Sequence, residues 1–128
     1  MIPGRVLDVS ALVDIAVGKT SYSRSVTTLC LLRGGGIVIP STALAEVFSI
    51  APLDTQVELD QLATTEGVRV DDFTAGKVSV IGEILDGSRD VTAAHVIWCA
   101  RSTGWPILTD RGDEIARYDP HVEIDPVP

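Results

Sequence analysis

Short apolar runs rich in β-branched residues recur along the chain, and stretches with helical spacing separate them. The runs are RVLDV (5–9), IVIP (37–40), VRVDD (68–72), PILT (106–109) and a last one near HVEID (121–125). Runs this short and apolar are typical of strands buried on both faces of a sheet. The resulting order, β-α-α-β-α-α-β-α-α-β-α-β, predicts an α/β fold in which helices flank both faces of a parallel sheet of four to five short strands.

Capping residues mark where several of the helices should begin and end. Ser10 is expected to cap the helix after the first strand, and Ser41 or Thr42 the helix after the second. Asp90 is expected to cap a later helix that Gly104 ends.

The length and composition fit one folded domain over residues 1–128. Hydrophobic residues make up 45% of the chain and charged residues 22%, which excludes a disordered tail and a membrane protein. No apolar stretch approaches the roughly 18 residues of a membrane span. An aspartate, Asp8, lies where a signal peptide would be continuously apolar, so we expect a cytoplasmic protein without a membrane segment.

The charge of the chain is strongly negative, with 10 Lys and Arg against 18 Asp and Glu and a net charge of -8. Such a field disfavours nonspecific binding of nucleic acid and suits a basic protein partner, but it does not exclude a nuclease whose pocket is recharged by metal. Cys30 and Cys99 form no CxxC or Cys/His cluster in the sequence, so reduced, buried thiols are expected. His95 is expected to be packed or exposed rather than catalytic.

Four acidic residues fall where parallel sheets bind their ligands, beyond the carboxyl ends of the strands. Asp8 is near the end of the first strand and Asp110 directly follows the fourth. Asp90 begins the helix that leads to the fourth strand, and Glu46 lies in the helix after the second. Carboxylates gathered in one pocket repel one another unless cations are present, so this set predicts Mg²⁺ or Mn²⁺ bound through oxygen. A phosphodiester substrate would complete such a site.

Ordinary structural roles compete for each of these acids. Asp90 is a standard N-cap, and Asp110 can cap the turn DRGDEI in the same way. Asp8 is harder to explain, because it interrupts a buried strand where a charge needs a partner or a metal. Glu46 is one position too far from Thr42 for a capping box and can simply face solvent.

The segments around these acids resemble the PIN-domain family, particularly small VapC-type toxins of toxin–antitoxin pairs. The likeness rests on VLDVSALV (6–13), on Glu46 and on AAHVIWCARSTGWPILTD (93–110), and it spans nearly the whole chain. Asp8 and Ser10 match the family's D-x-S or D-x-T start, and Thr109 matches the hydroxyl residue that ends the fourth strand. The resemblance implies a PIN-like sheet, frequent homodimers, Mg²⁺- or Mn²⁺-dependent endoribonuclease activity and inhibition by an antitoxin.

Two positions depart from the family pattern. Related toxins carry a metal-binding aspartate directly before A-H, where this chain has Ala93, and a fourth acid two residues after the threonine, where it has Arg111. Asp90 lies one helical turn before Ala93, and Asp110 is one residue early. Weak metal binding is therefore expected, because Mg²⁺ demands near-ideal octahedral geometry.

The direction of the Arg111 side chain separates two cases that the sequence leaves open. Pointing inward, its guanidinium would pair with Asp8 or Glu46 and occupy the metal's place. Pointing outward, it would lie in solvent or contact an RNA phosphate.

The sequence therefore predicts a metal-dependent endoribonuclease, the toxin of a toxin–antitoxin pair, with RNA as its substrate. The predicted site has catalytic Asp8, Glu46, Asp90 and Asp110, of which Asp8, Asp90 and Asp110 bind Mg²⁺ or Mn²⁺, with Ser10 and Thr109 in support. The alternative is a catalytically degenerate PIN-like module that binds a protein partner or RNA. Phosphate-accepting receivers and haloacid-dehalogenase-like enzymes also place an aspartate after the first strand, but LDVS lacks the second aspartate of D-x-D, and no suitably placed lysine follows the later strands.

Overall fold

The structure, a computed structural model, describes residues 3–128; Met1 and Ile2 of the expected domain lie outside the described residues. The elements follow the predicted order. The strands are β1 (Arg5–Leu7), β2 (Ile37–Pro40), β3 (Val68–Asp71), β4 (Ile107–Thr109) and β5 (Ile124–Pro126). The helices are α1 (Val9–Val17), α2 (Tyr22–Leu32), α3 (Ser41–Ile50), α4 (Leu53–Ala63), the 3₁₀ turn η1 (Ala75–Lys77), α5 (Val78–Leu85), α6 (Val91–Thr103) and α7 (Gly112–Tyr118).

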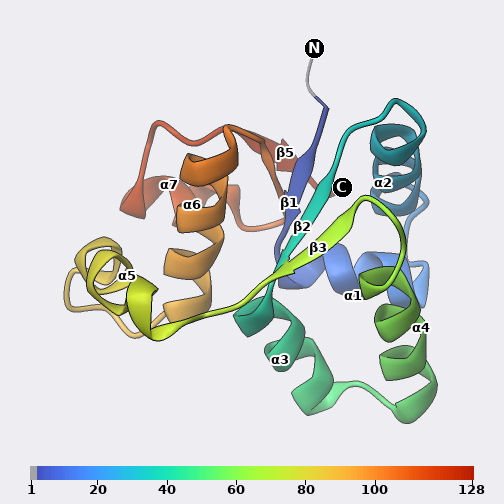
Figure 1. Cartoon of the computed structure of the whole chain (residues 1–128), viewed down its shortest axis with the longest axis horizontal. Helices are drawn as coiled ribbons and strands as arrows, with labels where there is room; N and C mark the ends of the chain where they lie inside the picture. The colour runs from blue at the N-terminus through green and yellow to red at the C-terminus, as the bar shows by residue number, and fades with distance from the viewer. Residues whose placement is uncertain (1–2) are drawn as a thin grey trace.

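The five strands form one sheet in the order β3-β2-β1-β4-β5, and every neighbouring pair is parallel. The central strand β1 pairs with β2 on one side and with β4 on the other (Figure 1). Strand order reverses between these neighbours, so the carboxyl end of β1 is the switch point at which ligands are expected.

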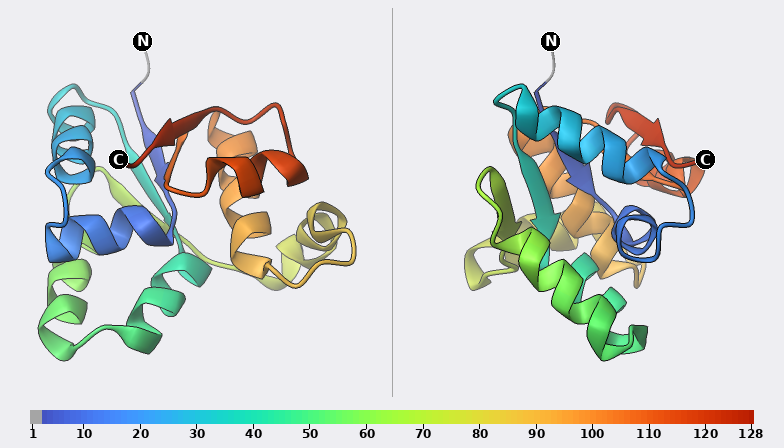
Figure 2. Two further views of the ribbon diagram at one scale, coloured as in Figure 1. Left: turned by 180° about the vertical axis from the view of Figure 1, so that it is seen from behind. Right: turned by 90° about the vertical axis from the view of Figure 1, so that its right-hand side faces the viewer.

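Helices cover both faces of the sheet because alternate residues of each strand point in opposite directions. Val6 and Ile107 pack in one core cluster with residues of α5, α6 and α7. Leu7 and Leu108 pack in a second cluster with residues of α1, α2, α3 and α4. Figure 2 shows the two groups of helices on opposite sides of the strands. The predicted α/β fold, with helices on both faces of a parallel sheet, is confirmed.

The helix caps differ from the prediction at two of three places. The chain turns from β1 straight into α1, so Asp8 rather than Ser10 is the N-cap. Pro40 takes the place of Ser41 or Thr42 as N-cap of α3, and the Ser41 hydroxyl instead accepts the N–H of Phe73 at 3.0 Å. Asp90 caps α6 as predicted, through a 3.0 Å hydrogen bond from the Ala93 N–H.

Both cysteines are free and buried, as predicted.

The indole of Trp105 lies against the residues that come just before β1 and β2. It is so close to Gly4 and Gly36 that a Cβ on either glycine would overlap it. Within residues 3–128, no helix combines the length and apolar character that crossing a membrane requires.

Candidate functional site

The carboxyl end of β1 positions Asp8, which is fully buried. The neighbouring strand β4 ends in Thr109, and the Thr109 hydroxyl donates to Asp8 Oδ2 at 2.7 Å. Ser10, in the first turn of α1, accepts the backbone N–H of Asp110 at 2.9 Å. These two bonds join the ends of β1 and β4. The predicted supporting residues, Ser10 and Thr109, therefore lie directly at this strand junction.

The side chain of Arg111 points inward onto the carboxylates. Its Nε donates to Asp8 Oδ2 at 2.7 Å and its Nη2 to Asp8 Oδ1 at 3.0 Å, a two-pronged contact. Its Nη1 donates to Asp90 Oδ2 at 2.6 Å. Hydrogen bonds with Asp8 raise the pKa of Arg111, so the guanidinium keeps its charge here. Of the two directions the sequence left open, the structure has the inward one, with Asp90 rather than Glu46 as the second partner.

Glu46 and Asp110 lie near this ion pair but outside it. Both side chains are exposed, and Glu46 Oε1 accepts the Thr92 hydroxyl at 2.9 Å. They line a pocket of about 400 Å³ together with Asp8, Ser10 and Arg111. Asp14 and Lys19 also line this pocket, which therefore carries more negative than positive side chains.

Two of the three carboxylates expected to bind Mg²⁺ or Mn²⁺, those of Asp8 and Asp90, are engaged with the Arg111 guanidinium in this arrangement. Both oxygens of Asp8 and one of Asp90 already accept hydrogen bonds from a guanidinium. Within residues 3–128, one group of three Asp, Glu, His or Cys side chains has its ligand atoms within 4.8 Å of one another. That group contains none of the predicted metal ligands. A fixed positive charge thus lies between two of the carboxylates that were expected to bind a metal ion.

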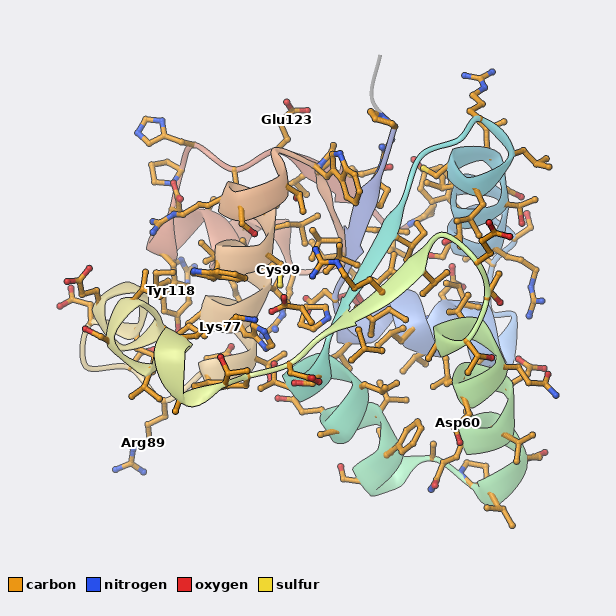
Figure 3. All side chains as sticks on the ribbon, in the orientation of Figure 1. Asp60, Lys77, Arg89, Cys99, Tyr118 and Glu123 are labelled. Atoms are coloured by element: carbon orange, nitrogen blue, oxygen red, sulfur yellow. The ribbon has the colours of Figure 1, made fainter. Side chains whose placement is uncertain are left out.

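That other group, Asp71, His95 and Cys99, lies buried on the α6 side of the sheet. His95 Nε2 is 2.8 Å from Asp71 Oδ2, and His95 Nδ1 is 2.8 Å from the Thr42 hydroxyl. Since an ionised carboxylate can only accept, Nε2 carries the proton and Nδ1 accepts from Thr42. Lys77 Nζ donates to Asp71 Oδ2 at 2.8 Å, and Figure 3 shows Lys77 and Cys99 where α6 faces β3.

Burial and neighbouring charges shape the titration of this group. Burial lowers the pKa of His95 and raises the pKa of the Cys99 thiol, so both are neutral. Burial alone would raise the pKa of Asp71, but hydrogen bonds from Lys77 and His95 outweigh it and hold the pKa below its usual range. The sequence interpretation missed this cluster. The i, i+4 spacing of His95 and Cys99 on one helix was its one local signal.

Comparison with known proteins adds a structural likeness. No protein-family model matches the chain, and no curated protein matches it in sequence. A chain of the crystal structure of VapBC2 from Rickettsia felis, bound to a DNA fragment from their promoter, superimposes with a TM-score of 0.68 at 20% identity. The match covers 96% of this chain and 98% of that one. At this identity the likeness is one of fold, and it places the chain among proteins with the parallel α/β sheet that the sequence resemblance implied.

Proposed function

We propose that this protein is a PIN-like binding module of the toxin–antitoxin type, which acts through a protein partner. The observation that carries the proposal is the ion pair of Arg111 with Asp8 and Asp90, which occupies the acidic pocket with an internal cation. The fold likeness to a chain of VapBC2 supports a partner of the antitoxin kind. One PIN-like domain over 1–128, a homodimer and a cytoplasmic location belong to the same proposal.

An apolar surface beside the pocket supports a protein partner. Val17, Ile50 and Leu53 are 66%, 77% and 76% exposed, at the end of α1, the end of α3 and the start of α4. A small groove runs between these helices and shares Val13 with the acidic pocket. The chain as a whole carries a net charge of -8. A basic segment with one apolar face would match both features.

A metal-dependent endoribonuclease acting on RNA is the second candidate. The observation that favours it is the pocket itself, in which Asp8, Glu46, Asp110 and Ser10 meet at the switch point of the sheet. This function requires the Arg111 guanidinium to release both of its carboxylates before Mg²⁺ or Mn²⁺ can bind them.

Metal binding and RNA cleavage by the purified full chain distinguish the two functions. We expect no heat of Mg²⁺ or Mn²⁺ binding in calorimetry and no cleavage of RNA in either metal. Arg111→Asp exchanges the internal cation for the acid found in related toxins, and we expect this variant to gain metal binding. RNA cleavage by the wild-type chain that needs metal and disappears in Asp8→Asn would overturn the binding-module proposal in favour of the nuclease.

The partner surface is tested by co-expression with the product of the adjacent gene. We expect a complex that Ile50→Glu or Leu53→Glu disrupts, because a charge would be buried against the partner's apolar face. Val78→Glu is the matched control, because Val78 is also apolar and 55% exposed but lies on α5. A complex that withstands the first two substitutions would place the partner elsewhere.

A further inference from the structure

We propose that Asp71, His95 and Cys99 form a binding site for one divalent ion of the zinc class, separate from the acidic pocket. The site offers one carboxylate oxygen, one imidazole nitrogen and one thiol sulfur. Nitrogen and sulfur donors select Zn²⁺ or Co²⁺, whereas Mg²⁺ prefers an all-oxygen site. This inference does not depend on the proposed function.

The ligand atoms are already close to the spacing that zinc requires. All three lie within 4.8 Å of one another. Zinc bonds of about 2.0–2.3 Å in a tetrahedral arrangement put neighbouring ligand atoms about 3.3–3.8 Å apart. The hydrogen bond of 2.8 Å between His95 Nε2 and Asp71 Oδ2 would widen as the ion replaces the proton between them. The three ligand side chains must draw closer together, and Lys77 must leave Asp71 Oδ2.

Rigid elements and outer partners orient the ligands. His95 and Cys99 lie four residues apart on α6, so both side chains lie on one helix face. Thr42 already contacts His95 Nδ1 at 2.8 Å, and its hydroxyl can accept the Nδ1–H of a metal-bound imidazole. Arg69 donates to Asp71 Oδ1 at 3.0 Å, which leaves Oδ2 toward the other two ligands.

The charges of the site can accommodate a dication. Asp71 supplies one negative charge, and Cys99 supplies a second when the ion displaces the thiol proton to solvent. Lys77 is the cation that must move away from Asp71 Oδ2. It has two other partners within reach, the Asp72 carbonyl at 2.7 Å and the face of the Trp98 ring at 4.6 Å. Lys77 also reaches solvent, with 18% of its side chain exposed.

Cobalt titration of the chelator-treated, reduced full chain tests this site. We expect one Co²⁺ per chain, with a thiolate-to-cobalt charge-transfer band in the near ultraviolet, and displacement of that cobalt by Zn²⁺. Cys99→Ala should remove the band and weaken Zn²⁺ binding at least about tenfold. Thr42→Val keeps all three ligands and changes only the outer partner of His95, so it should weaken Zn²⁺ binding about tenfold while the band remains.

Two matched variants distinguish this site from metal binding at the second thiol or in the acidic pocket. Cys30→Ala removes the other buried thiol and should leave the band and the affinity unchanged. Asp8→Asn alters the acidic pocket and should also leave both unchanged. The proposal fails if the folded wild-type chain gives no thiolate band, if the band withstands Cys99→Ala, or if Cys30→Ala removes it. Should Cys99→Ala not fold, Thr42→Val and the wild-type spectrum still decide the question.

Discussion

Asp8 and Asp71 both lie at the carboxyl ends of parallel strands, yet their neighbours give them opposite chemistry. Asp8 follows β1, and one permanently charged guanidinium contacts both of its oxygens. Asp71 ends β3 and meets Arg69, Lys77, a neutral imidazole and a thiol. The imidazole can bind a metal through Nε2 when its proton moves to Nδ1, and the thiol can lose its proton to solvent. Both carboxylates lie at the carboxyl ends of strands, and the side chains around each carboxylate decide which cation that carboxylate can bind.

The two sites also differ in their access to solvent. The Asp8 site opens into a pocket of about 400 Å³ with exposed Glu46 and Asp110 at its rim. The Asp71 site is closed, with all three candidate ligands buried. An open pocket suits a partner or substrate that comes and goes, whereas a closed site suits an ion held for the lifetime of the fold.

Replacing Arg111 should break the first site most severely. Arg111→Ala leaves the buried Asp8 carboxylate without its counter-charge, and we expect a loss of about 3 kcal/mol in the free energy of unfolding. Urea denaturation measures this loss, and Mg²⁺ should recover part of it. Arg89→Ala is the control, because Arg89 is exposed and points away from the chain (Figure 3). Equal stability of Arg111→Ala and the wild type would contradict the role given to this ion pair.

Asp71→Asn is the corresponding change in the second site. It keeps the shape but weakens the charge-assisted hydrogen bonds from Arg69, Lys77 and His95, so we expect a loss of about 2 kcal/mol without metal. Thermal unfolding with and without Zn²⁺ checks it. Zinc should raise the melting temperature of the wild type and not that of the variant, and an equal rise in both would argue against Asp71 as a ligand.

A pair of substitutions at Asp90 sharpens the distinction between its two roles. Asn is a good N-cap, so Asp90→Asn should lose only the ion pair with Arg111, whereas Asp90→Ala should lose the cap as well. We expect Asp90→Ala to be less stable than Asp90→Asn by about 1 kcal/mol. Chemical denaturation of the two variants measures the difference, and identical values would show that the cap contributes nothing.

Acid should destabilise the protein through a carboxylate outside these two sites, Asp14, with little effect near neutral pH. Burial alone would raise the pKa of Asp14, but hydrogen bonds from Ser23 and Thr20 hold the pKa below its usual value of 3.8. The unfolded chain therefore binds a proton more readily than the folded one, so this stability is present above about pH 4 and lost below it. Melting temperatures measured as the pH falls should drop less steeply in Asp14→Asn than in the wild type. A parallel decline would exclude Asp14 as a source of acid sensitivity.

The order of the elements could be predicted from the sequence because each depends on local patterns. Short apolar runs such as IVIP (37–40) form the buried strands, and Asp90 and Gly104 mark the ends of α6 as expected. The caps at Ser10 and Ser41 could not be predicted in the same way. Their hydroxyls bond instead to the N–H groups of Asp110 and Phe73, which are far away in sequence.

The candidate sites were harder to predict because they depend on contacts between distant segments. The sequence identified Asp8, Asp90 and Arg111 as members of one neighbourhood but could not choose the direction of the Arg111 side chain. Asp71 gave no signal of its own, since it closes an ordinary strand, and its partner His95 lies 24 residues further along the chain. The catalytic role expected for Glu46, and the catalytic and metal-binding roles expected for Asp8, Asp90 and Asp110, stay predictions.

Helix α6 connects the two sites, because Asp90 caps its first turn while His95 and Cys99 lie farther along it. At about 1.5 Å per residue, the nine steps from Asp90 to Cys99 span about 13.5 Å. This helix packs against the sheet along most of its length, so it fixes the distance between the two sites. Paramagnetic cobalt held at Cys99 would then broaden the magnetic resonance signals around Arg111 by an amount that reports the distance, and arrival of a partner in the pocket could be followed from within the core.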